Sequence, residues 1–295
     1  MLISVFTPTY RSTATLRRSY ESLCNQTYKN FEWIVVDDFS NDNNETINLI
    51  ENLKEEAPFP VKTFYFEENH FGGKSMAKAV EFAEGELFVL LDHDDQFKQD
   101  ALSAASSLAG KYFEDENIGG IVGRCENEKG EYIGKRFLQD IEMDYEGHLR
   151  YSQSIFSEFC TFFRTSILKK HVGIMKKGFS YGVLMATLSQ FHKMVFTNKV
   201  FRIYDTSVET SYTNSTSLNT RFPSELVEMN LIVFDIYKKY FVKQPVLTFK
   251  QLVHTNYLIR KYGIKPKELF KSSKKISLLL ALTKPVAVLK HKIRG

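Results

Sequence analysis

The sequence contains little cysteine and no long apolar run. Three cysteines in 295 residues share no short spacing and are too few for a disulfide scaffold, so we expect them to stay reduced and to hold no metal. No stretch approaches the 18 consecutive apolar residues of a membrane span, and the first residues lack the basic start and apolar core of a signal peptide. These absences favour a cytoplasmic protein.

Charge is unevenly distributed along the chain. Residues 261–295 hold ten Lys or Arg and a single acid, Glu268, so the net charge of this segment is +9. Because the net charge of the whole chain is +4, that of the remainder is −5. A tail that mixes Leu and Ile with lysines suits the anionic inner face of a membrane, which predicts a peripheral contact through residues 265–295. The alternative is a soluble packing helix with a basic end. The acidic body argues against nucleic acid as a partner.

The first 125 residues alternate between strand-like and helix-like segments. Each strand is followed by a helix in the pairs 2–8 and 13–26, 31–38 and 43–56, 61–66 and 74–85, and 86–92 and 99–113. Asn43 and Asn44 are candidates to cap the second helix, and Gly85 is the expected end of the third. Four successive β–α units imply parallel strands with right-handed crossovers. The fold class is therefore α/β, with a mostly parallel, Rossmann-like central sheet flanked by helices.

The regular alternation ends near residue 125. Strands are expected at 118–125 and 194–205, and the polar segment 126–160 has no clear periodicity. Helices are expected at 224–241, 249–263 and 266–284, which makes the last third a helical C-terminal region.

Carboxylates follow two of the expected strands, Asp37 and Asp38 after one, and Asp92, Asp94 and Asp95 after another. Ligands of parallel α/β sheets bind at the carboxyl ends of strands. Clustered acids repel one another unless a cation meets them, and Mg²⁺ or Mn²⁺ suits such oxygen ligands. The alternative is a solvated acidic turn that caps the following helix. Two clusters at neighbouring strand ends favour a site for a metal and a nucleotide.

The segment "ENHFGGKS" (68–75) offers a competing P-loop hypothesis, because Gly-Lys-Ser stands between a strand and a helix. A P-loop needs glycine five residues before its Gly-Lys pair, and that position is Glu68 here. A carboxylate is electrostatically unsuited to wrap a phosphate. Lys74 could still offer its ammonium to a diphosphate.

Several ordered motifs together resemble family 2 glycosyltransferases of GT-A fold. They are "SVFTPTYRS" at the first strand, "SLCNQTYKNFEWIVVDDFSND" (22–42) and "ENHFGGKSMAKAVEFAEGELFVLLDHDD" (68–95). The resemblance is dense over residues 3 to about 110 and thinner afterwards. It implies a GT-A domain over residues 1–215, with a nucleotide-sugar half at 1–125 and an acceptor half at 126–215. Residues 216–295 would form a helical, basic extension.

The resemblance also implies site residues. In the Thr-Pro-Thr-Tyr motif, Thr7 and Tyr10 would lie beside the nucleotide base and Pro8 would shape the turn. Asp38 would read the edge of the uracil, with Asp37 in support, and Lys74 would approach the nucleotide. Asp92, His93 and Asp94 match the Asp-X-Asp signature. In this assignment Asp92 faces the ribose or diphosphate, Asp94 and Asp95 meet the metal directly or through water, and His93 lines the nucleotide sugar or is only a spacer.

The catalytic base is the main departure from the family pattern. When an acceptor hydroxyl attacks the anomeric carbon, a carboxylate normally removes its proton. The resemblance places that acid near "GFSYGVLMATLSQ" (178–190), where Tyr181 stands instead. The base is therefore unassigned, and Tyr181 is joined as a weak candidate by five acids: Asp140, Asp144, Glu158, Asp205 and Glu209.

The expected function is metal-dependent transfer of a sugar, with inversion, from a UDP-sugar to a glycan or lipid-linked acceptor in cell-surface polysaccharide synthesis. Mn²⁺ or Mg²⁺ would be the cofactor. Because the usual acid is missing near Tyr181, an alternative is a nucleotide-sugar-binding protein of the same fold without transferase activity. A third hypothesis is a P-loop phosphotransferase that depends on Lys74.

Overall fold

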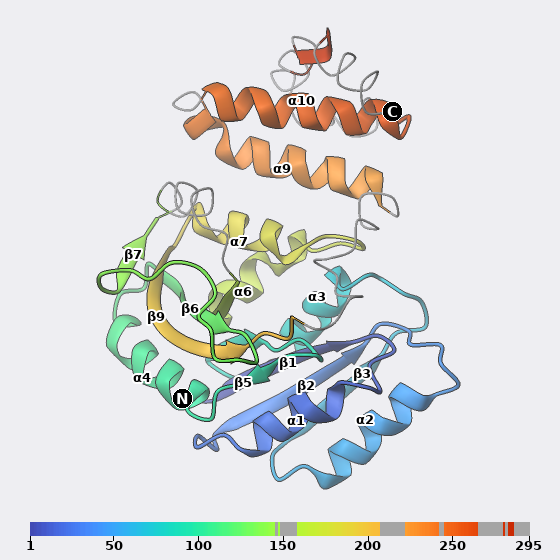
Figure 1. Cartoon of the computed structure of the whole chain (residues 1–295), viewed down its shortest axis with the longest axis vertical. Coiled ribbons are helices and arrows are strands. Elements are labelled where there is room, and N and C mark those ends of the chain that lie inside the picture. The colour runs from blue at the N-terminus through green and yellow to red at the C-terminus, as the bar shows by residue number, and fades with distance from the viewer. Residues whose placement is uncertain are drawn as a thin grey trace. The chain divides into compact units, whose positions relative to one another are not determined.

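The computed structural model describes residues 1–144, 147, 158–206, 222–241, 245–264, 280 and 283–285 (Figure 1). The chain divides into two compact units. The first comprises Met1–Lys177 and Leu188–Glu209, and the second comprises Gly178–Thr187 and Thr210–Gly295. The sheet lies in the first unit, and the second unit is helical in its described part.

A nine-stranded sheet forms the centre of the first unit within the described residues. The strand order is β3-β2-β1-β4-β8-β6-β9-β5, with β7 paired to β9. The strands are β1 (Ile3–Thr9), β2 (Phe31–Asp37), β3 (Val61–Tyr65), β4 (Leu87–Leu90), β5 (Gln96–Phe97), β6 (Ile118–Glu126), β7 (Ile141–Met143), β8 (Phe159–Arg164) and β9 (Lys193–Ile203). Strands β1 to β4 are mutually parallel, which confirms the predicted succession of β–α units.

Helices cover both faces of the parallel strands. The buried side chains of α1 (Leu16–Cys24), α2 (Glu45–Glu56) and α4 (Ala101–Tyr112) join one hydrophobic cluster with alternate residues of β1 and β2. Figure 1 shows α1 and α2 passing in front of β2 and β3. Helix α3 (Gly73–Phe82) contacts β1 and β2, but its buried side chains lie outside that cluster, so it packs on the opposite face. The mixed α/β class predicted from the sequence is confirmed.

Two predictions about the residues at helix ends are wrong. Asn43 and Asn44 do not cap α2, because both adopt left-handed backbone, and the carboxylate of Asp42 accepts the N–H of Thr46 instead, at 3.3 Å. Gly85 does not end α3, which stops at Phe82. A β-carbon at Gly85 would lie 2.5 Å from the backbone nitrogen of Ser4, so glycine is required there because the chain passes close to β1.

The segment without clear periodicity contributes to the sheet. Strand β8 lies between β4 and β6 and is antiparallel to both. Strand β5, two residues long, pairs with the end of β9, so that Gln96 lies opposite Ile203 and Phe97 opposite Arg202. This pairing brings the end of β9 to the turn after β4, where the acidic residues lie.

The second unit is helical where it is described. It contains most of α7 (Tyr181–Ser189) together with α9 (Pro223–Phe241) and α10 (Pro245–Lys261), which pack against each other. Their buried side chains include Val227, Leu231, Phe234 and Leu258. The helix expected at 266–284 lies mostly outside the described residues. No helix in the described part of the chain is both long and apolar enough to cross a membrane.

Candidate functional site

The carboxyl ends of three neighbouring strands bring the predicted site residues together. Strands β2, β1 and β4 are adjacent and parallel, with Thr9 opposite Asp37 and Phe6 opposite Leu90. The segments that follow these strands begin with Tyr10, Asp38 and Leu91. Residues that are far apart in sequence therefore meet at one edge of the sheet, where ligands of parallel α/β sheets bind.

Asp37 holds the two turns of this edge together. Its side chain is 1% exposed and accepts hydrogen bonds from the hydroxyl of Thr9 at 3.0 Å and from the backbone N–H of Ser40 at 2.9 Å. The hydroxyl of Ser40 donates to the same carboxylate. Through these contacts Asp37 holds the turns after β1 and β2 together. The sequence analysis did not identify Thr9 or Ser40 as its partners.

Asp38 fixes the loop that leads to Lys74. Its two carboxylate oxygens accept the backbone N–H groups of His70 at 2.7 Å and of Gly72 at 2.8 Å. Burial raises the pKa of Asp38, and the two N–H donors oppose that rise. Each oxygen keeps further acceptor capacity, so holding the loop is compatible with accepting an N–H from a nucleobase. Lys74 lies exposed in the first turn of α3.

Residues of the first strand differ in what they can offer a ligand. Thr7 is fully buried, and its hydroxyl accepts the indole N–H of Trp33 at 2.9 Å. Its side chain therefore belongs to the packing of the sheet. Pro8 and Thr9 separate it from Tyr10, which is 43% exposed and has the guanidinium of Arg11 at 5.4 Å from its ring centre. Tyr10 presents an aromatic face to solvent at the site edge.

The four residues of the acidic turn have different surroundings. Asp92 is 36% exposed in its side chain, whereas Asp95 is 1% exposed. The Nδ1 atom of His93 lies 2.8 Å from the hydroxyl of Thr15, so this ring is held against the entry to α1. Within the described part of the chain, the carboxylate of Asp94 has no hydrogen-bond or ion-pair partner and is half-buried. Asp94 is thus the acid of this turn that is available to a ligand.

Arg202 of β9 is a site residue that sequence reasoning missed. Its guanidinium Nη1 lies 3.1 Å from a carboxylate oxygen of Asp92 and 3.1 Å from one of Asp95. Burial raises the pKa of Asp95, and the positive charge of Arg202 opposes this rise. A single arginine between apolar residues of the expected strand at 194–205 was the available signal, because an isolated buried charge needs a partner.

A second guanidinium supports the same turn from α1. Arg18 donates to the backbone oxygen of Asp94 at 2.6 Å and to the carboxylate of Asp205. The backbone N–H of Asp205 in turn donates to Asp95 at 3.0 Å. The hydroxyl of Ser19 donates to the backbone oxygen of Asp95 at 2.6 Å. The turn is therefore held from α1 and from the segment after β9.

The acidic turn supplies only part of the ligand shell that a divalent ion requires. No group of three or more His, Cys, Asp or Glu in the described residues could hold a metal ion by itself. Mg²⁺ in particular usually takes one or two carboxylates and completes its shell with water and substrate phosphates. Asp94 offers an available carboxylate, whereas Oδ2 of Asp95 lies 3.1 Å from Nη1 of Arg202 and is already paired with a cation. The residues fit a divalent ion shared with a substrate diphosphate.

The candidate bases are dispersed. Glu158 has an oxygen 3.7 Å from Nη2 of Arg202 and is 34% exposed in its side chain. Asp205 is 4% exposed and paired with Arg18. Tyr181 belongs to the second unit, and Glu209 lies outside the described residues. Two further acids lie near β7 and make local contacts: Asp140 accepts the hydroxyl of Tyr112, and Asp144 accepts the N–H of Gly147.

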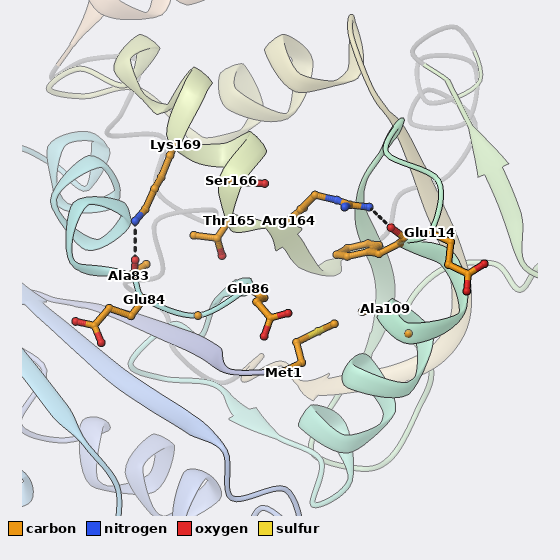
Figure 2. A pocket seen from close by; sticks show the side chains of 13 residues that line it. Met1, Ala83, Glu84, Glu86, Ala109, Glu114, Arg164, Thr165, Ser166 and Lys169 are labelled. Atoms are coloured by element: carbon orange, nitrogen blue, oxygen red, sulfur yellow. Dashed lines mark hydrogen bonds between the residues drawn. The ribbon is translucent and has the colours of Figure 1, made fainter.

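A pocket in the described part of the chain lies away from these residues. It has a volume of about 720 Å³ and is lined by residues that include Met1 and Glu86, which precede β1 and β4. Figure 2 shows that Lys169 and Arg164 already donate to backbone oxygens, of Ala83 at 2.7 Å and of Phe113 at 2.9 Å. The pocket is at the amino end of the strands, opposite the candidate site.

The lowered pKa of His70 predicts that the stability of the folded protein depends on pH. Burial lowers its pKa, with help from the charge of Lys74. The unfolded chain, in which a histidine titrates near pH 6.5, therefore binds more protons than the folded chain below that pH. The contribution is fully present above about pH 6.5, and the free energy of unfolding should fall as the pH is lowered toward 5. Urea unfolding followed by the fluorescence of Trp33, the single tryptophan, measures this.

The matched variant is His70→Gln, which keeps the backbone N–H that Asp38 accepts. It is expected to lose less stability than the wild type between pH 7 and 5. Burial also lowers the pKa of His171 and His192, so the difference between the two proteins isolates His70. Equal loss in both proteins would contradict the assignment.

The α/β sheet carries acids, a lysine and an aromatic ring at its carboxyl edge, as expected for a GT-A glycosyltransferase. Residues 4–172 match the model of glycosyl transferase family 2, which is more than half of the chain, and the chain belongs to this family. It is a glycosyltransferase. This membership decides against the P-loop hypothesis.

Two named relatives illustrate the similarity. A GalNAc(5)-diNAcBac-PP-undecaprenol beta-1,3-glucosyltransferase of Campylobacter jejuni is 28% identical over 224 residues, which cover 74% of this chain and 69% of the relative. A poly(ribitol-phosphate) beta-N-acetylglucosaminyltransferase, TarP of Staphylococcus aureus, is 30% identical over 142 residues, which cover 46% of this chain and 41% of the relative.

Solved structures share the fold. TarS 1–349 of S. aureus in complex with UDP-GlcNAc has a TM-score of 0.64 at 15% identity and covers 99% of this chain and 89% of that one. The mannosyltransferase PcManGT of Pyrobaculum calidifontis, in complex with GDP-Man and Mn²⁺, has a TM-score of 0.55 at 16% identity and covers 97% and 80%. At such identities the similarity establishes the GT-A fold.

Proposed function

We propose that this glycosyltransferase transfers a sugar from a UDP-sugar to a glycan or lipid-linked acceptor in the synthesis of a cell-surface polysaccharide. One observation carries the proposal: Asp38, the loop that it holds before Lys74, the exposed ring of Tyr10 and the acidic turn at Asp94 lie at one edge of the sheet. The relatives support the substrate classes, since one is named for a PP-undecaprenol acceptor and a TarS structure contains UDP-GlcNAc.

Each residue of this edge has a role in the proposed reaction. The ring of Tyr10 packs against the uracil, and Asp38 accepts its N–H. Lys74 places a positive charge near the diphosphate, where negative charge grows as the bond to the sugar breaks. Mn²⁺ or Mg²⁺, bound by Asp94 and supported by Asp95, would supply Lewis-acid stabilisation of the leaving diphosphate. Transfer in a single displacement inverts the anomeric carbon.

Glu158 is the base that the geometry favours among the candidates. It is partly exposed, and its carboxylate lies 3.7 Å from Nη2 of Arg202, whose Nη1 contacts Asp92 and Asp95 of the acidic turn. The side chain of Asp205 is 4% exposed and paired with Arg18, so it is poorly placed to accept a proton from an acceptor hydroxyl. Contact of residues 265–295 with an anionic membrane surface stays a prediction.

A nucleotide-sugar screen tests the proposal. Thermal unfolding is measured with Mn²⁺ and a panel of UDP-sugars and GDP-sugars. A ligand at 100 times its Kd stabilises the folded state by about 2.7 kcal/mol, which gives a clear rise in the unfolding midpoint. We expect at least one UDP-sugar to raise the midpoint. No rise with any UDP-sugar, or a rise with GDP-sugars alone, would contradict the proposed donor.

The alternative of a binding protein without transferase activity makes the same thermal prediction. Release of UDP separates the two, because a transferase releases UDP when a suitable glycan or lipid-linked acceptor is added. A binding protein without transferase activity releases no UDP by sugar transfer, whichever acceptor is added.

A further inference from the structure

Arg202 connects three acids that come from two separate segments of the chain. Besides Asp92 and Asp95 in the turn after β4, Nη2 of Arg202 lies 3.7 Å from Glu158 at the start of β8. The guanidinium also donates to the backbone oxygen of Phe159 at 3.3 Å and to Sγ of Cys125 at 3.4 Å. Its contacts fan out in several directions, as the fixed geometry of a guanidinium allows.

Burial makes these contacts important. Arg202 is 4% exposed and Asp95 is 1% exposed, so their charges have little access to water. A buried carboxylate without a cation is costly, and two of them side by side repel each other. With Arg202 in place, Asp92 and Asp95 are drawn to one point on the inner side of the turn. Asp94, between them in sequence, is left without a partner among the described residues.

We propose that Arg202 is a positioning residue of the donor site, which holds Asp92 and Asp95 so that Asp94 faces the metal and the diphosphate. The inference rests on the proposed function and deepens it. Arg202 itself touches neither ligand, and it acts through the shape of the turn. Strand β5 fixes its location, because Phe97, two residues after Asp95, pairs with Arg202 in the sheet.

Arg202→Lys tests this role because it keeps the positive charge and removes the planar guanidinium with its several N–H donors. A lysine ammonium is a point charge and cannot reproduce the contacts of Nη1, Nη2 and Nε together. We expect a folded protein whose affinity for UDP in the presence of Mn²⁺, measured by calorimetry, is about ten- to hundredfold lower. That range corresponds to the loss of one hydrogen bond to a charged group. Mn²⁺ affinity, followed by the paramagnetic resonance signal of the free ion, should fall in parallel.

Arg164→Lys is the matched control. Arg164 also bridges several acceptors, the backbone oxygens of Phe113, Asp115 and Ile118, but it lies at the opposite end of the strands. We expect this variant to bind UDP and Mn²⁺ as the wild type does. A reduction equal to that of Arg202→Lys would assign both effects to general destabilisation and contradict the proposal.

The outcomes separate this inference from the proposed function. If wild-type protein binds no UDP with Mn²⁺ or Mg²⁺, the proposed function fails. If wild type binds and folded Arg202→Lys binds within twofold of it, the positioning role is wrong and the function stands. Should Arg202→Lys not fold, Arg202→Gln carries the same test. Loss of folding in both variants would assign Arg202 to stability and would also overturn the proposal.

Discussion

Asp94→Asn is expected to lower the affinity for UDP in the presence of Mn²⁺ by at least about 100-fold. Changes to residues that merely support metal ligands already cost 10- to 100-fold in metal affinity, and a direct ligand should cost more. Since the Asp94 carboxylate has no partner among the described residues, its replacement by an amide of the same shape breaks no internal contact. The midpoint of thermal unfolding should therefore stay close to that of the wild type.

Asp100→Asn provides the control for Asp94. Asp100 follows the acidic turn and is 54% exposed in a surface pair with Lys199. Its replacement removes the same charge from the same region, but no ligand role is assigned to it. We expect unchanged UDP affinity by calorimetry. A decrease of similar size in both variants would mean that net charge, and not a specific ligand, governs binding, and equal binding by Asp94→Asn and wild type would contradict the metal assignment.

Asp95→Ala is expected to destabilise the first unit by about 3 kcal/mol. Removing one partner of a buried ion pair typically costs about 3–5 kcal/mol, because the other charge is left uncompensated. Arg202 retains Asp92, which places the expected cost at the lower end. The backbone N–H of Asp205 also loses its acceptor. Urea unfolding followed by the fluorescence of Trp33, which is fully buried in the sheet of this unit, measures the effect.

The companion variant is Asp95→Asn, whose amide oxygen can still accept the N–H of Asp205. It should be less destabilised than Asp95→Ala. A loss below about 1 kcal/mol in Asp95→Ala would contradict the view that the ion pair with Arg202 is buried and important, because surface pairs contribute only about 0–1 kcal/mol.

Much of the fold could be predicted because its signals are local. The apolar runs of β1, β2 and β4 and the helical spacing of Leu16, Tyr20 and Leu23 mark the β–α units directly. Strand β5 is two residues long and β7 three, which is too short for periodicity to appear. Strand β8 enters the sheet antiparallel between β4 and β6, and that long-range pairing has no local sequence signature.

The adjacency of the strand ends that carry the predicted site residues could be predicted, but the contacts of these residues could not. The order of the motifs placed Asp38, Lys74 and the acidic turn at one edge, which the strand pairing agrees with. Which atoms face inward depends on side-chain packing that sequence does not encode locally. The fully buried hydroxyl of Thr7 accepts the indole N–H of Trp33, and the buried carboxylate of Asp95 pairs with Arg202, which is contributed by a strand more than 100 residues away.

Titration of UDP into the folded wild-type protein with Mn²⁺, followed by calorimetry, tests the central claim most directly. The proposed donor site predicts saturable binding of one UDP per chain that weakens strongly when the metal is removed by a chelator. The absence of any binding heat with Mn²⁺ or Mg²⁺, on protein whose Trp33 fluorescence reports a folded first unit, would contradict the proposed UDP-sugar function.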